Sequence, residues 1–452
     1  MTDEKTPTSP ATTQIHGGVV PRETQNTVAT PIFQTAAYEF DDLATAQAIF
    51  ALEKPGNLYS RNANPTQAVF ERRMAALEGG VAALGVGSGQ AAVAVTLLSL
   101  VKTGQHIVAP AQLYGGTIDL LTDSFADFGI EVTLVDQDDL DAWRRAIRPN
   151  TRVLFAEGIG NPTATVLPMA EVAEIAHAAG VPLVIDSTLA TPILQRPKDF
   201  GADFVVHSAT KFLGGHGSSI AGVIVDLGTF DFGAEPRKWP QFTEPYKRVG
   251  GVVLWERFGR DKSAFLVYAK TKWVHDLGPS LSPFNSFQIL QGIETLDLRV
   301  SRQSASALAI AEFLEAHPAV SKVNHPGLAS SPYHELAARY LPKGSGAVFS
   351  FDVAAGEDAV ATVVDSLGVF SLVANIGDVR SLVIQPATTT HSHLTEDQLR
   401  DAGFSRATIR LSIGLEDVQD LIADLGQALD TVVPATVPSA AGVVGSTASR
   451  KD

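Results

Sequence analysis

The chain has 452 residues, of which 45% are hydrophobic and 18% are charged, and its formal net charge is −15. This composition excludes a disordered chain and is sufficient for two domains with buried cores. The acidic balance argues against a nucleic-acid-binding protein, and the lack of cysteine excludes disulfides, thiolate metal sites and a cysteine nucleophile.

Prolines punctuate residues 1–65, and no long periodic segment is present there, so we expect an extended arm. Residues 1–14 are polar and lack the apolar core of a secretion signal. Residues 79–101 carry no charge, but glycines and polar residues at 85–90 interrupt the run. This pattern favours a strand, a loop and a buried helix over a membrane span. We therefore expect a cytoplasmic protein that does not associate with membranes.

Helical and short apolar segments alternate from about Thr66 onward. Residues 168–179 are one helical pattern, with Met169, Val172 and Ala176 on one face. The alternation predicts an α/β fold in which helices cover both sides of a mostly parallel sheet, and we assign this large domain to residues 66–285. Its expected strands are 81–86, 106–109, 131–135, 153–156, 182–186, 204–207 and 221–225.

The remaining segments predict a second, smaller domain. Residues 226–280 are rich in proline, glycine and aromatic residues, and we expect them to be irregular. One long helix over 286–315 is expected to lead into a C-terminal domain that covers 286–432. Residues 433–452 are expected to be a flexible tail. The expected strands of the small domain are 347–353, 381–384 and 408–413, and its expected helices are 357–367 and 418–429.

Two apolar runs of the large domain end in chemically informative residues. Asp186 follows the run 181–185, and Ser208-Ala-Thr210-Lys211 follows the run 204–206. Ligands of parallel sheets bind beyond such carboxyl ends. Pyridoxal 5′-phosphate needs an anion for its ring nitrogen (Asp186), hydroxyls for its phosphate (Ser208 and Thr210) and a lysine for its aldehyde (Lys211). The alternative is chance, because Ser-x-Thr-Lys by itself is a weak motif.

A glycine-containing loop, Gly87-Ser-Gly89-Gln90-Ala-Ala92, follows an expected strand and opens an expected helix. Backbone amides at such a helix start form an anion site, and Gly89 allows close approach to a phosphate. We therefore expect Gly89 and Gln90 to contact the cofactor phosphate. A tight strand–helix turn without a ligand is the alternative, and the spacing does not match a dinucleotide fingerprint.

These motifs together closely resemble the family of pyridoxal-phosphate enzymes of cysteine and methionine metabolism, over about residues 15–430. The resemblance implies an aspartate-aminotransferase-like fold (fold type I), with a mostly parallel seven-stranded sheet in the large domain and a smaller C-terminal α+β domain. It also implies that Tyr114 stacks on the cofactor ring and that Asn161 contacts its 3′-oxygen. Tyr59 and Arg61 would bind the cofactor phosphate of the neighbouring subunit. A homodimer would then be the minimal active unit, with dimers pairing into a homotetramer, and Tyr59 and Tyr114 would assist proton transfer at Lys211.

Arg410 lies inside the apolar strand pattern 408–413, where an unpaired charge is unfavourable, so it needs an anionic partner. That partner is either a structural carboxylate or, as the resemblance implies, the α-carboxylate of an amino-acid substrate. The resemblance also places Ser371 and Asn375 at the substrate. His391-x-His393 lacks further ligands, so we expect no metal.

Residues 373–391 resemble the O-acetylhomoserine sulfhydrylases within this family, through Asn375-Ile-Gly-Asp-Val-Arg380-Ser-Leu. The implied reaction is replacement of the acetate of O-acetyl-L-homoserine by sulfide, which gives L-homocysteine for methionine biosynthesis. The alternatives are an O-succinylhomoserine sulfhydrylase, a cystathionine γ-synthase, a γ-lyase, and a cofactor-binding protein without catalysis.

Overall fold

The computed structural model describes residues 9–392 and 394–433, and a seven-stranded sheet forms its centre. The strand order is β1-β7-β6-β5-β4-β2-β3. Strand β7 is antiparallel to both neighbours, whereas the other pairs are parallel, so the expected mostly parallel sheet is confirmed. The strands are β1 (Ala82–Val86), β2 (His106–Pro110), β3 (Glu131–Val135), β4 (Thr151–Glu157), β5 (Leu183–Asp186), β6 (Phe204–Ser208) and β7 (Gly222–Asp226).

Strand alternation divides the core of this sheet between its two faces. Leu183 and Ile185 of β5 belong to one buried cluster, whereas Val184 belongs to another, because successive side chains point to opposite faces. The helices packed on the first face include α3 (Pro65–Glu78) and α8 (Met169–Ala178), and those on the second include α4 (Gly89–Leu100) and α12 (Ala264–Ala269). Shorter helices near this sheet are α5 (Gly115–Asp119), α6 (Phe125–Asp127), α7 (Leu140–Ala146) and α9 (Thr191–Leu194).

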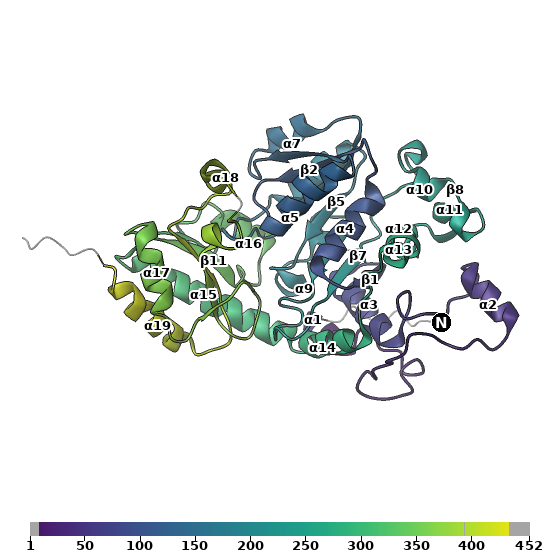
Figure 1. Ribbon diagram of the computed structural model, residues 1–452, viewed down its shortest axis with the longest axis horizontal. Coiled ribbons are helices and arrows are strands. Elements are labelled where there is room, and N and C mark those ends of the chain that lie inside the picture. Colours follow the sequence, from purple (N-terminus) through teal and green to yellow (C-terminus); the bar gives the residue numbers. More distant parts are fainter. Residues whose placement is uncertain (1–8, 393, 434–452) are drawn as a thin grey trace, which may run out of the picture.

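A second sheet of five strands, in the order β10-β11-β14-β13-β12, lies beside the first and is drawn in green to yellow in Figure 1. It is antiparallel except for the pair β12–β13. The three expected strands are present, and two short edge strands add to them. The strands are β10 (Val320–Asn324), β11 (Val348–Val353), β12 (Ser371–Leu372), β13 (Leu382–Ile384) and β14 (Thr408–Ser412). The helices are α16 (His334–Tyr340), α17 (Glu357–Asp365), α18 (Glu396–Asp401) and α19 (Val418–Asp430).

The expected single helix over 286–315 is wrong, because the segment forms two helices, α14 (Pro283–Ile293) and α15 (Leu296–Ala316). The guanidinium of Arg299 donates hydrogen bonds to the carbonyls of Gly292 at 2.7 Å and of Phe212 at 2.9 Å. The Gly292 carbonyl thus has a side-chain partner at the helix junction. The same arginine ties the junction to the turn that follows Lys211.

Two segments expected to be extended or irregular contain helices. The N-terminal segment includes α1 (Pro10–His16) and α2 (Leu43–Phe50), and Figure 1 shows it in purple, with α2 standing away from the sheets. The segment 226–280 contains α10 (Pro240–Thr243), α11 (Leu254–Phe258), α12, α13 (His275–Leu277) and the small pair β8 (Pro245–Tyr246) and β9 (Val252–Val253). No helix in residues 9–392 and 394–433 is long and apolar enough to span a bilayer. Residues 434–452 of the expected tail lie outside the described residues.

Candidate active site

A cavity of about 340 Å³ opens at the carboxyl ends of β4, β5 and β6, where the sequence predicts the ligand site. Arg410 on β14 and the loop after β12 close it from the five-stranded sheet. Ten of the predicted site residues line this cavity, which places candidates from both sheets around one space. They are Gly89, Gln90, Tyr114, Asn161, Asp186, Ser208, Thr210, Lys211, Asn375 and Arg410.

The start of α4 forms one end of the cavity. The side chain of Ser88 caps the helix by accepting a hydrogen bond from the Ala91 amide at 3.1 Å. The amides of Gly89 and Gln90, in the first turn, have no partner within the helix and can bind an anion. A Cβ atom on Gly89 would lie 2.5 Å from the Cβ of Ser208, so only glycine allows this close approach. The Ser208 hydroxyl has no hydrogen-bond partner in the described part of the chain.

Two of the predicted phosphate ligands already use their side chains elsewhere. The Thr210 hydroxyl donates to the Ala221 carbonyl at 3.1 Å and accepts from the Ala221 amide at 3.0 Å. The Gln90 side chain donates to the Gly116 carbonyl at 2.8 Å. Gln90 can therefore offer its backbone amide to an anion, while its side chain holds α4 against the start of α5.

Two carboxylates stand side by side on neighbouring strands, since Glu157 of β4 pairs in register with Asp186 of β5. Burial raises the pKa of both, and the charge of Asp186 raises the pKa of Glu157 further. Asp186 accepts a hydrogen bond from the Thr188 amide at 2.9 Å. Glu157 accepts from the amides of Tyr114 at 2.7 Å and Asn161 at 3.2 Å, so it fixes the backbone of two other cavity residues.

Lys211 lies half-buried beyond β6, and its Nζ atom donates a hydrogen bond to Oδ1 of Asn375 at 2.6 Å. Burial lowers the pKa of the lysine, and the nearby charge of Arg410 lowers it further. A lowered pKa increases the fraction of neutral amine near neutral pH. Lys211 is therefore suited to act as a nucleophile or base.

Arg410 is 3% exposed, in the middle of the five-stranded sheet. It donates to Oδ1 of Asn161 and to the backbone carbonyl of Asn375, each at 3.2 Å, and its Nε atom has no partner. Burial lowers its pKa to about 10. No carboxylate of the described residues pairs with it. A buried guanidinium with neutral partners and an unpaired N–H, facing a cavity, is suited to bind an anionic ligand.

Comparison with known proteins identifies the family. The model of the Cys/Met metabolism PLP-dependent enzymes matches residues 11–430. The chain belongs to this family of pyridoxal-phosphate-dependent enzymes. It is 46% identical to the O-acetyl-L-homoserine sulfhydrylase of Leptospira meyeri, over 94% of this chain and 97% of that one. It is 40% identical to the O-succinylhomoserine sulfhydrylase of Pseudomonas aeruginosa, over 88% and 90% of the two chains.

A solved structure from Campylobacter jejuni, described as a candidate O-acetylhomoserine (thiol)-lyase, superimposes with a TM-score of 0.89 at 36% identity. The superposition covers 94% of this chain and 100% of the Campylobacter jejuni chain, which carries a pyridoxyl-lysine 5′-monophosphate. The aspartate-aminotransferase-like fold of the pyridoxal-phosphate family is thereby confirmed. The cavity fits the family's cofactor, because it combines an anion cradle at Gly89, a hydroxyl without a partner on Ser208, a carboxylate and a lysine.

Three predicted residues of this pyridoxal-phosphate enzyme do not line the cavity of their own chain. Ser371 is exposed on the edge strand β12, where its amide pairs with the Ser381 carbonyl at 3.0 Å. Tyr59 is 41% exposed in the N-terminal segment, and the guanidinium carbon of Arg61 lies 5.0 Å from the centre of its ring. Arg61 has no hydrogen bond or ion pair with other described residues.

Sequence reasoning did not select several residues that line the cavity, among them Thr188 and Thr390. Thr188 connects two predicted residues, because its amide donates to Asp186 and its hydroxyl accepts from the Ser208 amide at 2.8 Å. Its place two residues after a strand-ending aspartate was the available signal, since aspartate often binds the backbone at that spacing. Nothing in the local sequence distinguishes Thr390.

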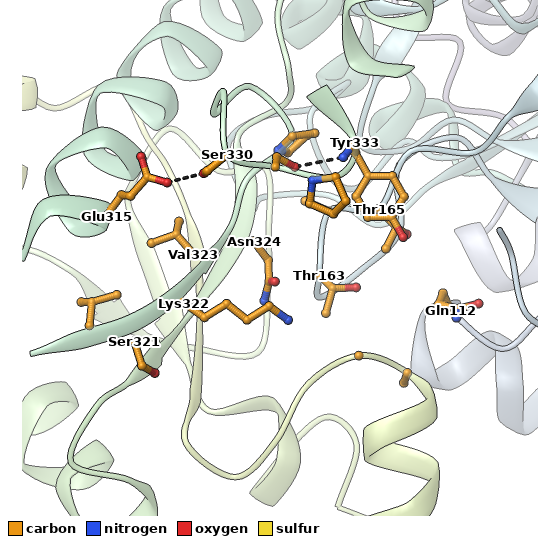
Figure 2. A pocket seen from close by; sticks show the side chains of 17 residues that line it. Gln112, Thr163, Thr165, Glu315, Ser321, Lys322, Val323, Asn324, Ser330 and Tyr333 are labelled. Carbon is orange, nitrogen blue, oxygen red and sulfur yellow. Dashed lines mark hydrogen bonds between the residues drawn. The ribbon is translucent and has the colours of Figure 1, made fainter. Parts of the chain in front are cut away.

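Figure 2 shows a second cavity, of about 430 Å³, between β10 and the segment that follows Asn161. Lys322 and Asn324 point into it from β10. Its carboxylate, Glu315, already accepts a hydrogen bond from Ser330. Glu157, Asp186 and Ser208, which end β4, β5 and β6 and line the smaller cavity of about 340 Å³, do not line this second cavity. We therefore place the candidate active site of this family member in the smaller cavity.

Proposed function

We propose that this chain converts O-acetyl-L-homoserine and sulfide into L-homocysteine and acetate. The observation that carries the proposal is the buried Arg410 guanidinium, which faces the cavity and lacks an anionic partner in the described structure. It is suited to the α-carboxylate of an amino-acid substrate. The similarity to the Leptospira meyeri sulfhydrylase supports the reaction, and the Asn375–Arg380 segment supports the subgroup.

In this proposal the cavity residues hold the cofactor as follows. The amides at the start of α4 and the Ser208 hydroxyl would receive the phosphate, and Thr210 would join them only by giving up its hydrogen bond to the Ala221 carbonyl. Asp186 would receive the ring nitrogen, Tyr114 would stack on the ring and Lys211 would bind the aldehyde. Asn161 reaches the ring's 3′-oxygen. When bound, pyridoxal phosphate supplies a sink for the electrons released at the substrate Cα.

Lys211 carries the proton transfers of the proposed reaction. Its amine, with a pKa lowered by burial and by Arg410, takes the proton from Cα and then moves a proton at Cβ, so that acetate leaves from Cγ. Sulfide adds at Cγ, and Lys211 returns the protons in the reverse order. Tyr114 and the neighbouring subunit's Tyr59 assist these transfers. Arg410 holds the carboxylate throughout and keeps Cα within reach of Lys211.

Replacing Arg410 with glutamine is expected to raise KM for the ester by about 100-fold, because the substrate carboxylate loses a buried charged partner. Steady-state kinetics would measure this change. Arg406→Gln is a matched control, because the half-buried Arg406 pairs with Glu357 and Glu396 outside the cavity. An unchanged KM in the Arg410 variant would remove the main support for an amino-acid substrate.

The acyl group is expected to be acetyl. Lys211 and Arg410 are the cations that line the cavity, and both have roles in the proposed reaction. Arg380 pairs with Asp378 at 3.0 Å and does not line the cavity, so among the described residues that line the cavity no cation remains for the second carboxylate of a succinyl ester. Sulfide is expected to be the acceptor because no site for a second amino acid is visible in the motifs.

Measurement of kcat/KM for both esters with sulfide and with cysteine tests this choice. We expect the acetyl ester to be preferred by at least about tenfold, which corresponds to roughly 1.4 kcal/mol of transition-state binding. A succinyl preference would favour the activity named for the Pseudomonas aeruginosa relative. Cystathionine as the main product would indicate a γ-synthase, and elimination without replacement a γ-lyase.

The N-terminal segment 1–65 is proposed as an arm that completes the site of a neighbouring subunit in a cytoplasmic homodimer, with dimers pairing into a homotetramer. Arg61 lacks hydrogen bonds and ion pairs with the described residues of its own chain, which supports a partner elsewhere. Large apolar side chains on the same segment are exposed, including Val28, Leu43 and Phe50 at 101%, 73% and 65%. Such exposure is typical of an interface.

Mixing two inactive variants tests the arm. Arg61→Ala protein and Lys211→Ala protein, mixed in equal amounts under subunit exchange, should recover about a quarter of the wild-type activity, because half of the dimers are hybrids with one intact site. Recovery would be measured by steady-state turnover. Native mass spectrometry with one isotope-labelled variant verifies exchange. If exchange occurs and no activity returns, Arg61 does not act across subunits.

A further inference from the structure

Asn375 contacts both cationic residues of the candidate active site, and it does so through different atoms. Its side-chain Oδ1 accepts a hydrogen bond from Lys211 Nζ at 2.6 Å. Its backbone carbonyl accepts from Arg410 Nη2 at 3.2 Å. A change of the side chain can therefore remove the contact with the lysine while it keeps the backbone contact with the arginine.

The loop that carries Asn375 is fixed from three directions. The Gly377 amide donates to the Ser412 hydroxyl on β14 at 2.9 Å. The Val379 amide donates to the Gly215 carbonyl, in the turn after Lys211, at 2.8 Å. The side chain of Gln303 on α15 donates to the Asp378 carbonyl at 2.8 Å. Strand β14, the turn after Lys211 and helix α15 thus all contribute to holding the Asn375 loop at the lysine.

The proposed reaction needs a fixed partner for the lysine. With the cofactor bound, substrate binding would free the Lys211 amine, which sits on a flexible four-carbon stem. The amine must then reach Cα and Cβ in turn, so its position determines the rate. A neutral amine that donates one N–H to the side-chain Oδ1 of Asn375 keeps its lone pair for the substrate proton.

We propose that Asn375 is a positioning residue that holds the free Lys211 amine for its proton transfers, rather than a ligand of the substrate. The proposal rests on the proposed function for its catalytic part. Its contact with the lysine, however, exists without any substrate.

The Asn375 side chain carries no charge, and this affects the pKa of Lys211. The titratable groups that line the same cavity are Arg410, Tyr114, Glu157 and Asp186. Arg410 and burial lower the pKa of Lys211, which favours the amine. An aspartate at 375 would place an anion at hydrogen-bond distance and raise the lysine pKa. An alanine at 375 would remove the Oδ1 acceptor. Because that oxygen stabilises the ammonium form of Lys211 more than the neutral amine, its loss would lower the pKa of Lys211.

The test compares Asn375→Ala and Asn375→Asp with Val373→Ala, a control at an exposed position of the same loop that does not line the cavity. In Asn375→Ala we expect kcat to fall by about 10- to 100-fold, within the range of lost general-base catalysis, with KM for the ester changed by less than about twofold. In Asn375→Asp the acidic limb of the kcat profile should move to higher pH. Circular dichroism verifies that each variant folds.

A second readout does not depend on turnover. The rate at which the cofactor-free protein binds pyridoxal phosphate covalently, followed by absorbance against pH, reports the free amine of Lys211. This profile should move to lower pH in Asn375→Ala and to higher pH in Asn375→Asp. Unchanged profiles in both variants would overturn the proposal. A rise in KM equal to the loss in kcat/KM, with kcat unchanged, would assign Asn375 to the substrate and also overturn it. Failure of every ester with the wild-type enzyme would reject the proposed function while these profiles still test Asn375.

Discussion

Turnover is expected to fall by about 10⁴-fold or more when Lys211 is replaced with alanine, because the variant loses the proposed nucleophile for the cofactor aldehyde, which is also the proposed base for the substrate proton. The fold should survive, since the lysine is half-buried and its side chain makes one hydrogen bond, to Asn375. Steady-state kinetics measures the loss of activity.

Chemical mapping tests the same assignment directly. Borohydride reduction of the holoenzyme, followed by peptide mass analysis, should place the cofactor on Lys211. Lys270→Ala is a suitable control, because Lys270 does not line the cavity. A cofactor label on Lys270 or Lys272 would contradict the assignment of Lys211.

Asp186→Asn is expected to retain the cofactor but to lose about 100-fold or more in kcat, because a neutral amide does not keep the ring nitrogen protonated. The amide oxygen of asparagine can still accept from the Thr188 amide, so the local fold is preserved. Cofactor content and kcat should be measured together. Asp199→Asn, an exposed change away from the cavity, serves as the control. Undiminished turnover in the Asp186 variant would show that another group holds the nitrogen proton.

The strands of the large sheet could be predicted because their apolar runs are short, bounded and buried on both faces. Ile185 and Val184, for example, belong to opposite core clusters and are both fully buried. The short helices α10 and α11 were missed because Pro236, Pro240 and Gly250 divide this part of the chain into pieces too short for a helical period, a reason that does not extend to the uninterrupted helical run 264–277. Arg299, near the break between α14 and α15, reaches the Phe212 carbonyl over 87 residues of chain, a contact that local patterns do not reveal.

The candidate site could be predicted where a polar side chain suited to bind a ligand directly follows an apolar strand pattern, as at Asp186 and Ser208. Contacts between distant segments were not predictable in this way. The hydrogen bond from Lys211 to Asn375 joins residues 164 positions apart, and local patterns contain no information about it. Ser371 was placed by resemblance at the substrate, but an edge strand of two residues leaves it exposed on the surface of its own chain. Its proposed substrate contact stays a prediction.

The attachment of α15 to the segments beside Lys211 and Arg410 has a consequence for heat inactivation. Arg299 holds the turn after Lys211, whereas Gln303, one turn later, donates to the carbonyls of Asp378 and Ile413 beside Arg410. One helix that belongs to neither sheet thus helps to fix the distance between the Lys211 amine and Arg410, together with the Val379–Gly215 hydrogen bond. Warming that loosens this helix would separate the two groups while each sheet keeps its own hydrogen bonds. Substrate affinity should then decline at a lower temperature than the one at which the chain melts.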